Sequence, residues 1–282
     1  MNGVEDCRLS KIVFLGTGTS QGVPVIGCQC EVCRSPDFRD HRLRTSIALE
    51  GKKSRVVVDT GPDFREQMLR EGMDYLDGVV YTHEHKDHLA GMDDVRPFNF
   101  LQKQPIVLRA SERVEAALRR DFYYAFDDHR HGGVPHVQIE RVCDFEGFEM
   151  GEMTWEQLPV MHGTLPIHGY RVDNVAYITD ANMIPGPTLN RLAGLDILIV
   201  NALRHDVHYS HFSLSEALEV ASKVAANKTY LTHVSHLMGK HETVQLELPE
   251  GVSLAYDGLV LVRREQGWEE EVSDWTTTRW ST

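Results

Sequence analysis

The 282-residue sequence has no run of eighteen or more apolar residues, the length that a membrane-spanning helix needs. Its first residues also lack the basic segment and following apolar segment of a secretory signal peptide. Basic residues are the scarcer charge, with 29 Lys and Arg against 42 Asp and Glu and a formal net charge of −13. We therefore expect a cytoplasmic protein with no membrane partner. A nucleic-acid partner is disfavoured, because such binding draws its affinity from Lys and Arg that neutralise phosphates.

Cysteine is scarce too, but three of the five cysteines, Cys28, Cys30 and Cys33, lie within six positions. Clustered cysteines in a cytosolic chain favour a metal over a disulfide. Three thiolates leave a tetrahedral zinc one ligand short, and His236 is our candidate for the fourth. A reactive thiol centre is the alternative, although Glu31 opposes the lowered thiol pKa that such a centre needs.

The remaining composition, 41% hydrophobic and 25% charged, is that of an ordinary globular protein. We expect one domain over residues 1–282, with an extension of unassigned role from about residue 265 to 282. This extension contains Trp268, Trp275 and Trp280. An edge cover, a homodimer contact and a frayed tail are the three interpretations of it.

Ligand-type side chains are densest at His83, His85, Asp87 and His88. Apolar residues 76–81 predict a buried strand before this cluster, and a helical pattern begins near residue 91, so the cluster lies on a strand-to-helix loop. His83 and His85 share a face, because residues two apart in an extended segment do so. A turn can bring Asp87 and His88 to a second metal. The alternative is that these histidines lie on the surface, are exposed to solvent and bind no metal.

Further predicted strands end in residues that can bind a metal, namely His162, Asp180 and His233. Asp59 likewise ends the second strand of a hairpin predicted over residues 46–50 and 55–59. Its carboxylate could hydrogen-bond a metal-ligating histidine, or it could act as a turn or capping residue. A mixed set of imidazoles and carboxylates does not name the metal.

Two other segments have weaker signals. Phe64, Met68 and Leu69 have helical spacing, with Asp63 as a candidate cap. The polar loop 127–133, which contains His129, Arg130 and His131, is either a lid that meets an anionic substrate or a solvated loop.

The ordered ligand set resembles the metallo-β-lactamase superfamily over nearly the whole chain. It consists of Asp59, His83, His85, Asp87, His88, His162, Asp180 and His233. The resemblance implies an α+β fold of the αββα sandwich type, with two packed sheets flanked by helices. It also implies that His83, His85 and His162 hold one metal, that Asp87, His88 and His233 hold the other, and that Asp180 bridges them.

Within the superfamily, Cys28, Cys30, Cys33 and His236 resemble the structural zinc site of the phosphoribosyl 1,2-cyclic phosphate phosphodiesterases of the carbon–phosphorus lyase pathway. That resemblance implies two catalytic divalent metals, Mn or Zn, besides the structural zinc. It also implies hydrolysis of a small anionic cyclic phosphodiester by a hydroxide between the metals. Asp87 would be essential for turnover and His211 would protonate the leaving group, with His208 as a rival.

Two other functions stay open. A tRNA 3′-processing endonuclease of the same superfamily would apply similar chemistry to a polyanion. A non-hydrolytic cofactor-pathway protein resembling the coenzyme PQQ synthesis protein B would share the cysteine cluster.

Overall fold

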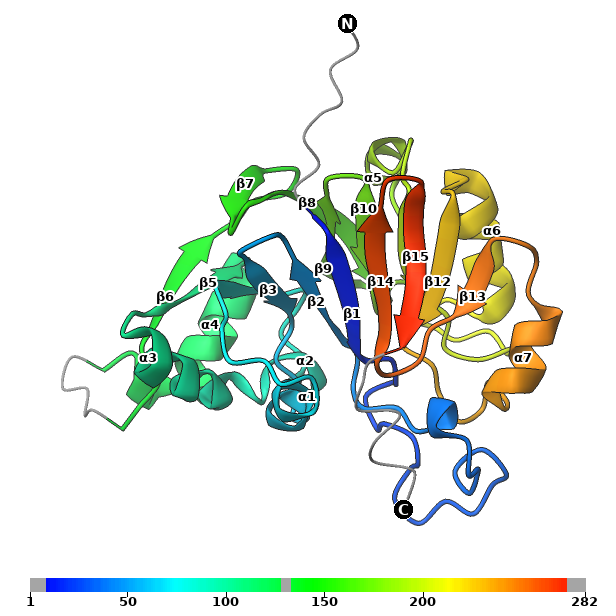
Figure 1. Cartoon of the computed structure of the whole chain (residues 1–282), viewed down its shortest axis with the longest axis horizontal. Coiled ribbons are helices and arrows are strands. Elements are labelled where there is room, and N and C mark those ends of the chain that lie inside the picture. Colours follow the sequence, from blue (N-terminus) through cyan, green and yellow to red (C-terminus); the bar gives the residue numbers. More distant parts are fainter. Residues whose placement is uncertain (1–8, 128–132, 273–282) are drawn as a thin grey trace, which may run out of the picture.

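The computed structural model describes residues 9–127 and 133–272, in which two β-sheets pack face to face (Figure 1). The first sheet has the strand order β15-β14-β1-β2-β3-β4-β5-β6. Its strands are β1 (Lys11–Gly16), β2 (Ser46–Glu50), β3 (Arg55–Val58), β4 (Gly78–Val80), β5 (Ile106–Ala110), β6 (Val137–Arg141), β14 (Leu259–Arg264) and β15 (Gly267–Val272). The second sheet has the order β13-β12-β11-β10-β9-β8-β7. Its strands are β7 (Gly147–Met150), β8 (Met153–His162), β9 (Leu165–Val172), β10 (Val175–Ile178), β11 (Ile197–Asn201), β12 (Lys228–Thr232) and β13 (Val252–Leu254).

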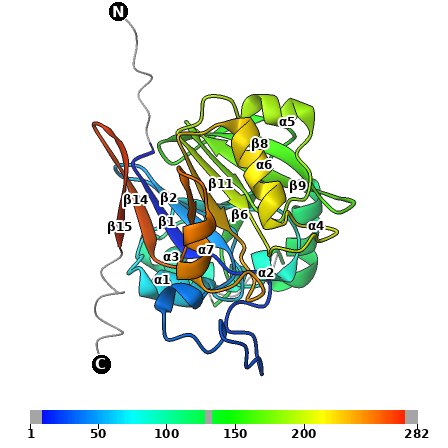
Figure 2. The same ribbon diagram turned by 90° about the vertical axis from the view of Figure 1, so that its right-hand side faces the viewer.

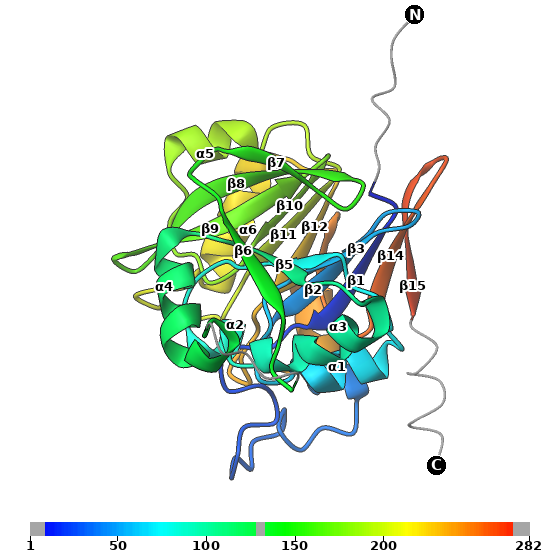
Figure 3. The ribbon, with the colours of Figure 1, turned by 90° about the vertical axis from the view of Figure 1, so that its left-hand side faces the viewer.

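Helices cover the outer face of each sheet. Figure 2 shows α5 (Gly186–Arg191), α6 (Leu214–Val224) and α7 (His241–Glu247) beside the second sheet. Figure 3 shows α1 (Phe64–Arg70), α3 (Arg96–Gln102) and α4 (Glu112–Asp121) beside the first. Short helical turns complete the described chain, namely α2 (Lys86–Leu89) and the 3-10 helices Phe38–Asp40, Met92–Val95 and Tyr123–Ala125.

Three apolar clusters separate these four layers. The cluster between the sheets includes Phe14, Trp155 and Tyr230, all of them buried. A second cluster joins the first sheet to α1, α3 and α4, and a third joins the second sheet to α5, α6 and α7. The αββα sandwich predicted from the sequence is confirmed, because each sheet buries one face against the other and one face against helices.

Each sheet contains a run of parallel strands. In the first sheet β3, β4, β5 and β6 are parallel, and in the second β10, β11, β12 and β13 are parallel. Parallel strands place their carboxyl ends at one edge of a sheet, where the loops that follow them gather. Residues that follow β3, β4, β10 and β12 therefore share an edge of the sandwich.

The described part of the C-terminal extension is an edge strand. β15 pairs antiparallel with β14, and the side chain of Trp268 is almost fully buried. Residues 267–272 thus have the edge-covering role, one of the three interpretations. Trp275, Trp280 and the predicted lid residues His129, Arg130 and His131 lie outside the described residues.

Of three local predictions, one was wrong and two are confirmed. Asp63 precedes α1, but its carboxylate accepts hydrogen bonds from the backbone N–H and the guanidinium of Arg44 instead of capping the helix. The helix predicted from the spacing of Phe64, Met68 and Leu69 is confirmed as α1, in which Phe64 and Met68 are buried and Leu69 is 64% exposed. The helical segment expected near residue 91 is also confirmed, since the 3-10 helix Met92–Val95 begins there and continues into α3.

Strands β9, β13, β14 and β15 were not predicted, since their sequences lack a clear two-residue alternation bounded by turn residues. In the described residues, no helix is both long and apolar enough to cross a membrane.

Candidate metal centre

Three candidate site residues that follow parallel strands have a left-handed backbone. Asp59 follows β3 with φ 65°, Asp180 lies two residues after β10 with φ 59°, and His233 follows β12 with φ 57°. This conformation is uncommon outside glycine, and holding a residue in a sparsely populated region costs about 1–3 kcal/mol. Strain repeated at three strand ends that meet at one edge marks that edge as a functional site.

The donor atoms of the proposed ligands at this edge fall into two close groups, and a third close group, of His162, Asp180 and His211, overlaps both. His83, His85 and His162 form one group, in which the donor atoms lie within 4.8 Å of one another. The other group, with the same spacing, consists of Asp87, His88, Asp180 and His233. The structure therefore brings together all seven residues that the resemblance proposes as ligands, in the same two sets.

Asp180 lies between the two groups. Its Oδ2 is 3.1 Å from Nε2 of His233 and 4.0 Å from Nε2 of His83, while its Oδ1 is 3.4 Å from Nε2 of His88. One carboxylate thus faces a histidine of the first group and two of the second. This placement suits the bridging role proposed for it.

Asp59 orients two of the histidines, His88 directly and His83 through the hydroxyl of Thr82. Nδ1–H of His88 donates to Oδ2 of Asp59 over 2.8 Å. The hydroxyl of Thr82 donates to the same oxygen and lies 3.0 Å from Nδ1 of His83, from which it can accept. Nδ1 of each ring is thereby engaged, so that Nε2 is the ring nitrogen that would bind a metal. Asp59 occupies the supporting position and does not cap a helix.

His162 is oriented in the same way by a different loop. Its Nδ1–H donates to the carbonyl of Ser210 over 2.8 Å, so that its Nε2 is also left as the free donor atom. Burial lowers the pKa of His83 well below its ordinary value. Its imidazole is therefore neutral, as metal binding requires.

Unpartnered buried nitrogens test whether these residues fit a metal. His233 is 1% exposed and neither of its ring nitrogens has a hydrogen-bond partner, and Nε2 of His88 also lacks one. Buried polar atoms nearly always have a partner, and an unpaired one is costly. His233 does lie near Asp180, but without the geometry of a hydrogen bond. A divalent cation held by the second group would satisfy Nε2 of His88 and one ring nitrogen of His233, so the residues fit a metal.

His211 and His208 lie beside this centre, on the loop between β11 and α6. Nε2 of His211 is 3.4 Å from Oδ2 of Asp180, and its Nδ1 is 3.2 Å from Nδ1 of His208. Burial lowers the pKa of His211 to about 4, although Asp180 opposes the shift. Of the two candidate proton donors, His211 is the one in contact with the metal-site residues.

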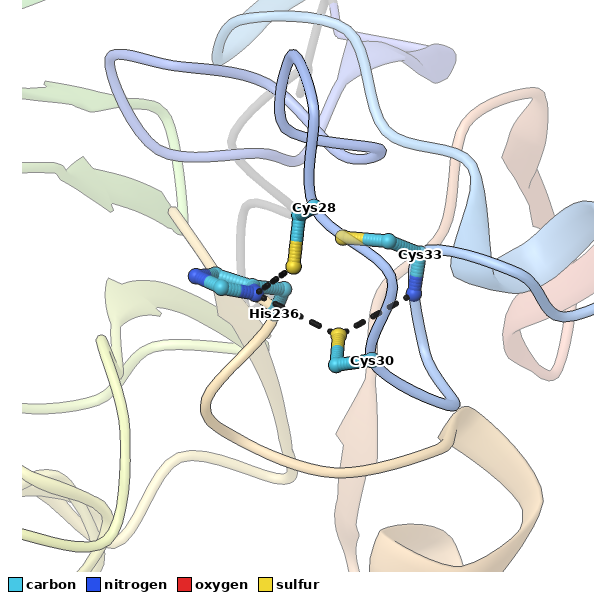
Figure 4. A group of neighbouring side chains, drawn as sticks. All are labelled: Cys28, Cys30, Cys33 and His236. Carbon is cyan, nitrogen blue, oxygen red and sulfur yellow. Dashed lines mark hydrogen bonds between the residues drawn. The ribbon is translucent and has the colours of Figure 1, made fainter.

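The cysteine cluster forms a separate site, shown in Figure 4. The three sulfurs and Nδ1 of His236 point toward one another, with Sγ of Cys28 and Sγ of Cys30 each 3.4 Å from that nitrogen. A backbone N–H from Cys33, followed by His236, lowers the pKa of Cys30 to about 6, whereas burial raises the pKa of Cys33 to about 11. Three thiols and one imidazole within 4.8 Å match the donor set of a tetrahedral zinc.

The two sites share a short segment. His233 belongs to the second donor group and His236 to the cysteine cluster, with Val234 between them. The backbone of Val234 exchanges hydrogen bonds with Thr17 and Thr19, at the start of the loop that carries the cysteines. The cysteine loop is thus attached to the strand end that positions His233.

The sequence profile of the family described as "Beta-lactamase superfamily domain" matches residues 54–234, more than half of the chain. The chain belongs to the β-lactamase superfamily. Within this superfamily it is similar to a structure described as a new diphosphatase from the PhnP family, with 41% identity and a TM-score of 0.84 over 94% of this chain and 98% of that one. This similarity supports assignment as a hydrolase with divalent metals.

Other similarities are more distant or partial. Zn²⁺-bound PqqB from Methylobacterium extorquens has a TM-score of 0.75, with 89% of this chain and 99% of that one covered. The short form of human tRNase Z has a TM-score of 0.65, with 89% and 98% covered. Each of the two is 18% identical in sequence to the chain described here. At that level the similarity shows a shared fold and nothing about function.

A curated relative named octanoyltransferase, from Porphyromonas gingivalis, is 35% identical over 261 residues. The match covers 91% of this chain but only 52% of that protein, so the chain spans about half the length of this relative.

The sequence reasoning missed Thr82 and Ser210 as orienting residues. Thr82 directly precedes His83, and a hydroxyl beside a ligand-type histidine is a signal that could have found it. Ser210 acts through its backbone carbonyl, which has no signal in the sequence.

Proposed function

We propose that this protein is a dinuclear metal-dependent hydrolase that cleaves a P–O bond in a small anionic phosphodiester, such as phosphoribosyl 1,2-cyclic phosphate, or in a related diphosphate. The observation that carries the proposal is the pair of donor groups with Asp180 between them. The similarity to a PhnP-family diphosphatase over 98% of that chain supports the P–O bond as the target.

Two Mn or Zn ions, held by the seven residues in the sets given above, would supply positive charge for the phosphoryl oxygens and a water with its pKa lowered from about 15.7 toward about 7. Cys28, Cys30, Cys33 and His236 would hold a structural zinc. In this proposal Asp87 is a ligand without which metal-dependent turnover is lost.

The residues of the chain hold the metals in place and supply a proton. The seven ligands fix the distance between the two charges, while Asp59 and Thr82 keep the rings of His88 and His83 in place. His211 protonates the leaving oxygen. Because burial lowers the pKa of His211 in the free protein, this role requires the negative charge of the substrate to raise it again.

The tRNA 3′-endonuclease alternative is disfavoured by the net charge of −13, since a polyanion would meet an acidic protein. The similarity to human tRNase Z, at 18% identity, concerns the fold. The non-hydrolytic alternative shares its fold with PqqB, but the PhnP-family relative is more than twice as identical to this chain. The octanoyltransferase is about twice as long as the segment that this chain matches. Its named activity is therefore not carried over to this chain.

The decisive experiment compares substrates at equal metal loading. Purified protein, with its Mn and Zn content measured, is assayed on bis-p-nitrophenyl phosphate, a ribose cyclic phosphate, 2′,3′-cyclic nucleotides, a nucleoside diphosphate sugar and precursor tRNA. Turnover of a small phosphodiester or diphosphate that disappears in Asp87→Asn supports the proposal. Cleavage of precursor tRNA alone would favour the endonuclease, and full metal loading without turnover of any substrate would favour the non-hydrolytic protein.

A further inference from the structure

An exposed tyrosine lies at the rim of the candidate metal centre. Tyr209 is 82% exposed and lies between His208 and Ser210 on the loop that joins β11 to α6. Ser210 accepts the hydrogen bond of His162, and His208 contacts His211. A single exposed apolar residue needs no explanation. The sequence neighbours of Tyr209, however, contact His162 and His211, so its ring has a defined position relative to these two candidate site residues.

The backbone at Tyr209 is held in place. Nδ2–H of Asn182 donates to the carbonyl of Tyr209 over 3.1 Å, and Oδ1 of the same Asn182 accepts the N–H of Gly163 over 2.7 Å. Asn182 thus joins the loop to the turn that directly follows His162. The ring of Tyr209 is exposed, but its attachment to the site is rigid.

The ring rests on small or flat groups. A Cβ placed on Gly163 would lie 3.7 Å from two ring carbons of Tyr209, an ordinary van der Waals distance, so the ring lies directly beside the turn at Gly163. On another side, the imidazole of His208 is 4.7 Å away between ring centroids. The ring therefore has support from the protein while most of its surface remains open to a ligand.

A positive charge accompanies the ring on the same loop. Arg204 donates only long hydrogen bonds, of 3.4 Å, to the carbonyls of Asp206 and Val207. Among the ion pairs of the residues that the structure describes, none involves Arg204. A guanidinium without a carboxylate partner can pair with a substrate phosphate, for which its planar fork is well shaped.

An exposed aromatic ring beside His208, with the guanidinium of Arg204 on the same loop, suits a nucleotide as substrate of the proposed centre. The base of a nucleotide has a flat π-face that stacks on a tyrosine whatever the base is, and its phosphates are anions. A sugar phosphate without a base would leave the ring of Tyr209 without a partner.

We propose that Tyr209 is a substrate-binding residue whose ring stacks on the base of a nucleotide, so that the protein prefers nucleotide phosphodiesters or diphosphates to base-free sugar phosphates. This inference rests on the proposed function and narrows its substrate class, within which phosphoribosyl 1,2-cyclic phosphate, having no base, is expected to bind less tightly than a nucleotide. Tyr209 positions the substrate and takes no part in bond cleavage.

The test uses two substrates that differ in the base alone, 2′,3′-cyclic AMP and methyl ribofuranoside 2,3-cyclic phosphate. Tyr209→Ala should raise KM for cyclic AMP by about 5- to 100-fold, the range that stacking on an aromatic side chain gives, with little change in kcat. KM for the base-free substrate should stay within about twofold, because it has nothing to stack. Tyr209→Phe should behave as the wild type, since it retains the ring.

Tyr123→Ala is the matched control, because Tyr123 is also an exposed tyrosine, at 69%, but lies in the 3-10 helix after α4. It should change neither KM. Equal effects of Tyr209→Ala on both substrates, or no effect on either, would overturn the proposal.

A titration with AMP, followed by calorimetry, separates this proposal from the proposed function. If the wild type hydrolyses neither substrate, the proposed function fails, but AMP binding still decides the role of Tyr209. Binding that weakens in Tyr209→Ala and persists in Tyr209→Phe supports stacking. Equal binding by all three proteins, or no binding by the wild type, contradicts it.

Discussion

Asp59 supports the candidate metal centre although it is not itself a proposed metal ligand. Its carboxylate receives the N–H and the hydroxyl of Thr82 as well as Nδ1–H of His88, and it is fully buried. Its left-handed backbone turns the side chain back under the loop that carries the histidines. Two candidate ligands of different metals, His83 and His88, therefore depend on one carboxylate.

Asp59→Asn should lower the affinity for the catalytic metals by about 10- to 100-fold, the usual effect of losing an orienting partner. Asparagine tolerates the left-handed backbone, so the fold should persist, but its amide cannot accept all three hydrogen bonds. Metal titration against a competing chelator measures the change.

Asp77→Asn is the control for this variant, because Asp77 accepts hydrogen bonds from Arg55 and Tyr75 and contacts none of the site histidines. Unchanged metal affinity in Asp59→Asn would show that Asp59 does not support the ligands.

His211 and His208 are separated by their contacts. We expect His211→Gln to lower kcat by about 10²- to 10⁴-fold at unchanged metal content, because a proton donor is lost while all seven proposed ligands remain. His208→Gln should have a much smaller effect. The pair of variants is compared by steady-state kinetics with metal analysis. Loss of metal from His211→Gln would instead make His211 a ligand, in line with its position near His162 and Asp180.

At the scale of elements, the turn after β12 connects two sites. It carries His233 into the centre between the sheets and His236 into the cysteine cluster, and its Val234 pairs with Gly18 in a β-bridge. The cysteine loop has only a small apolar cluster of its own, around Val23, Val32 and Cys33. A metal is therefore expected to supply much of its stability.

His236→Ala should release one zinc per chain and lower the melting temperature. Structural zinc contributes about 10–16 kcal/mol to the folding of zinc-finger peptides, and a fraction of that is large beside the stability of a domain. Metal analysis and calorimetry check both outcomes, and kcat should fall as well because His233 loses its anchor.

His205→Ala serves as the control, since His205 bonds the carbonyl of Met238 and does not belong to the cluster. Zinc content and melting that stay unchanged in His236→Ala would remove His236 from the ligand set.

On the scale of the whole molecule, a buried polar network joins segments from the two ends of the chain. Arg42 donates to the hydroxyl of Thr17 over 2.7 Å, and Thr17 in turn donates to Asp257 over 2.8 Å. Nη2 of Arg42 also lies 3.3 Å from Nδ1 of His241, at the start of α7. Because these groups are buried, the network is stable only while each ionisable group in it keeps its present protonation state.

The network predicts a stability that depends on pH through His241. Burial, followed by Arg42, lowers the pKa of His241 to about 3, against about 6.5 for an unfolded chain. Between these values the unfolded state binds more protons, so the contribution of neutral His241 is fully present above pH about 6.5 and is lost as the pH falls toward about 3.

His241→Asn keeps an acceptor for Arg42 but cannot be protonated, so its free energy of unfolding should fall less steeply with decreasing pH than that of the wild type. Urea unfolding at several values between about pH 6 and pH 4 measures both slopes. His136→Asn, at an exposed position, should follow the wild type. Parallel curves for His241→Asn and the wild type would contradict the prediction.

The fold class and the candidate ligand residues could be predicted because their signals are local. Val56, Val57 and Val58 before Asp59, like the apolar run before His233, show a buried strand and its end from periodicity and residue type alone. The spacing of Cys28, Cys30 and Cys33 likewise shows a donor set without reference to the rest of the chain.

The sequence by itself therefore determined which side chains can bind metals and which strands present them. Only the tertiary structure decided how they are grouped, because periodicity tells which face of a strand is buried but not which strand lies beside it. The position of Asp180 between two histidine groups, the link from Asp59 through Thr82 to His83, and the placement of Tyr209 over Gly163 all arise from contacts between residues distant in sequence. Those contacts form when parallel strands meet at one edge and two sheets pack face to face.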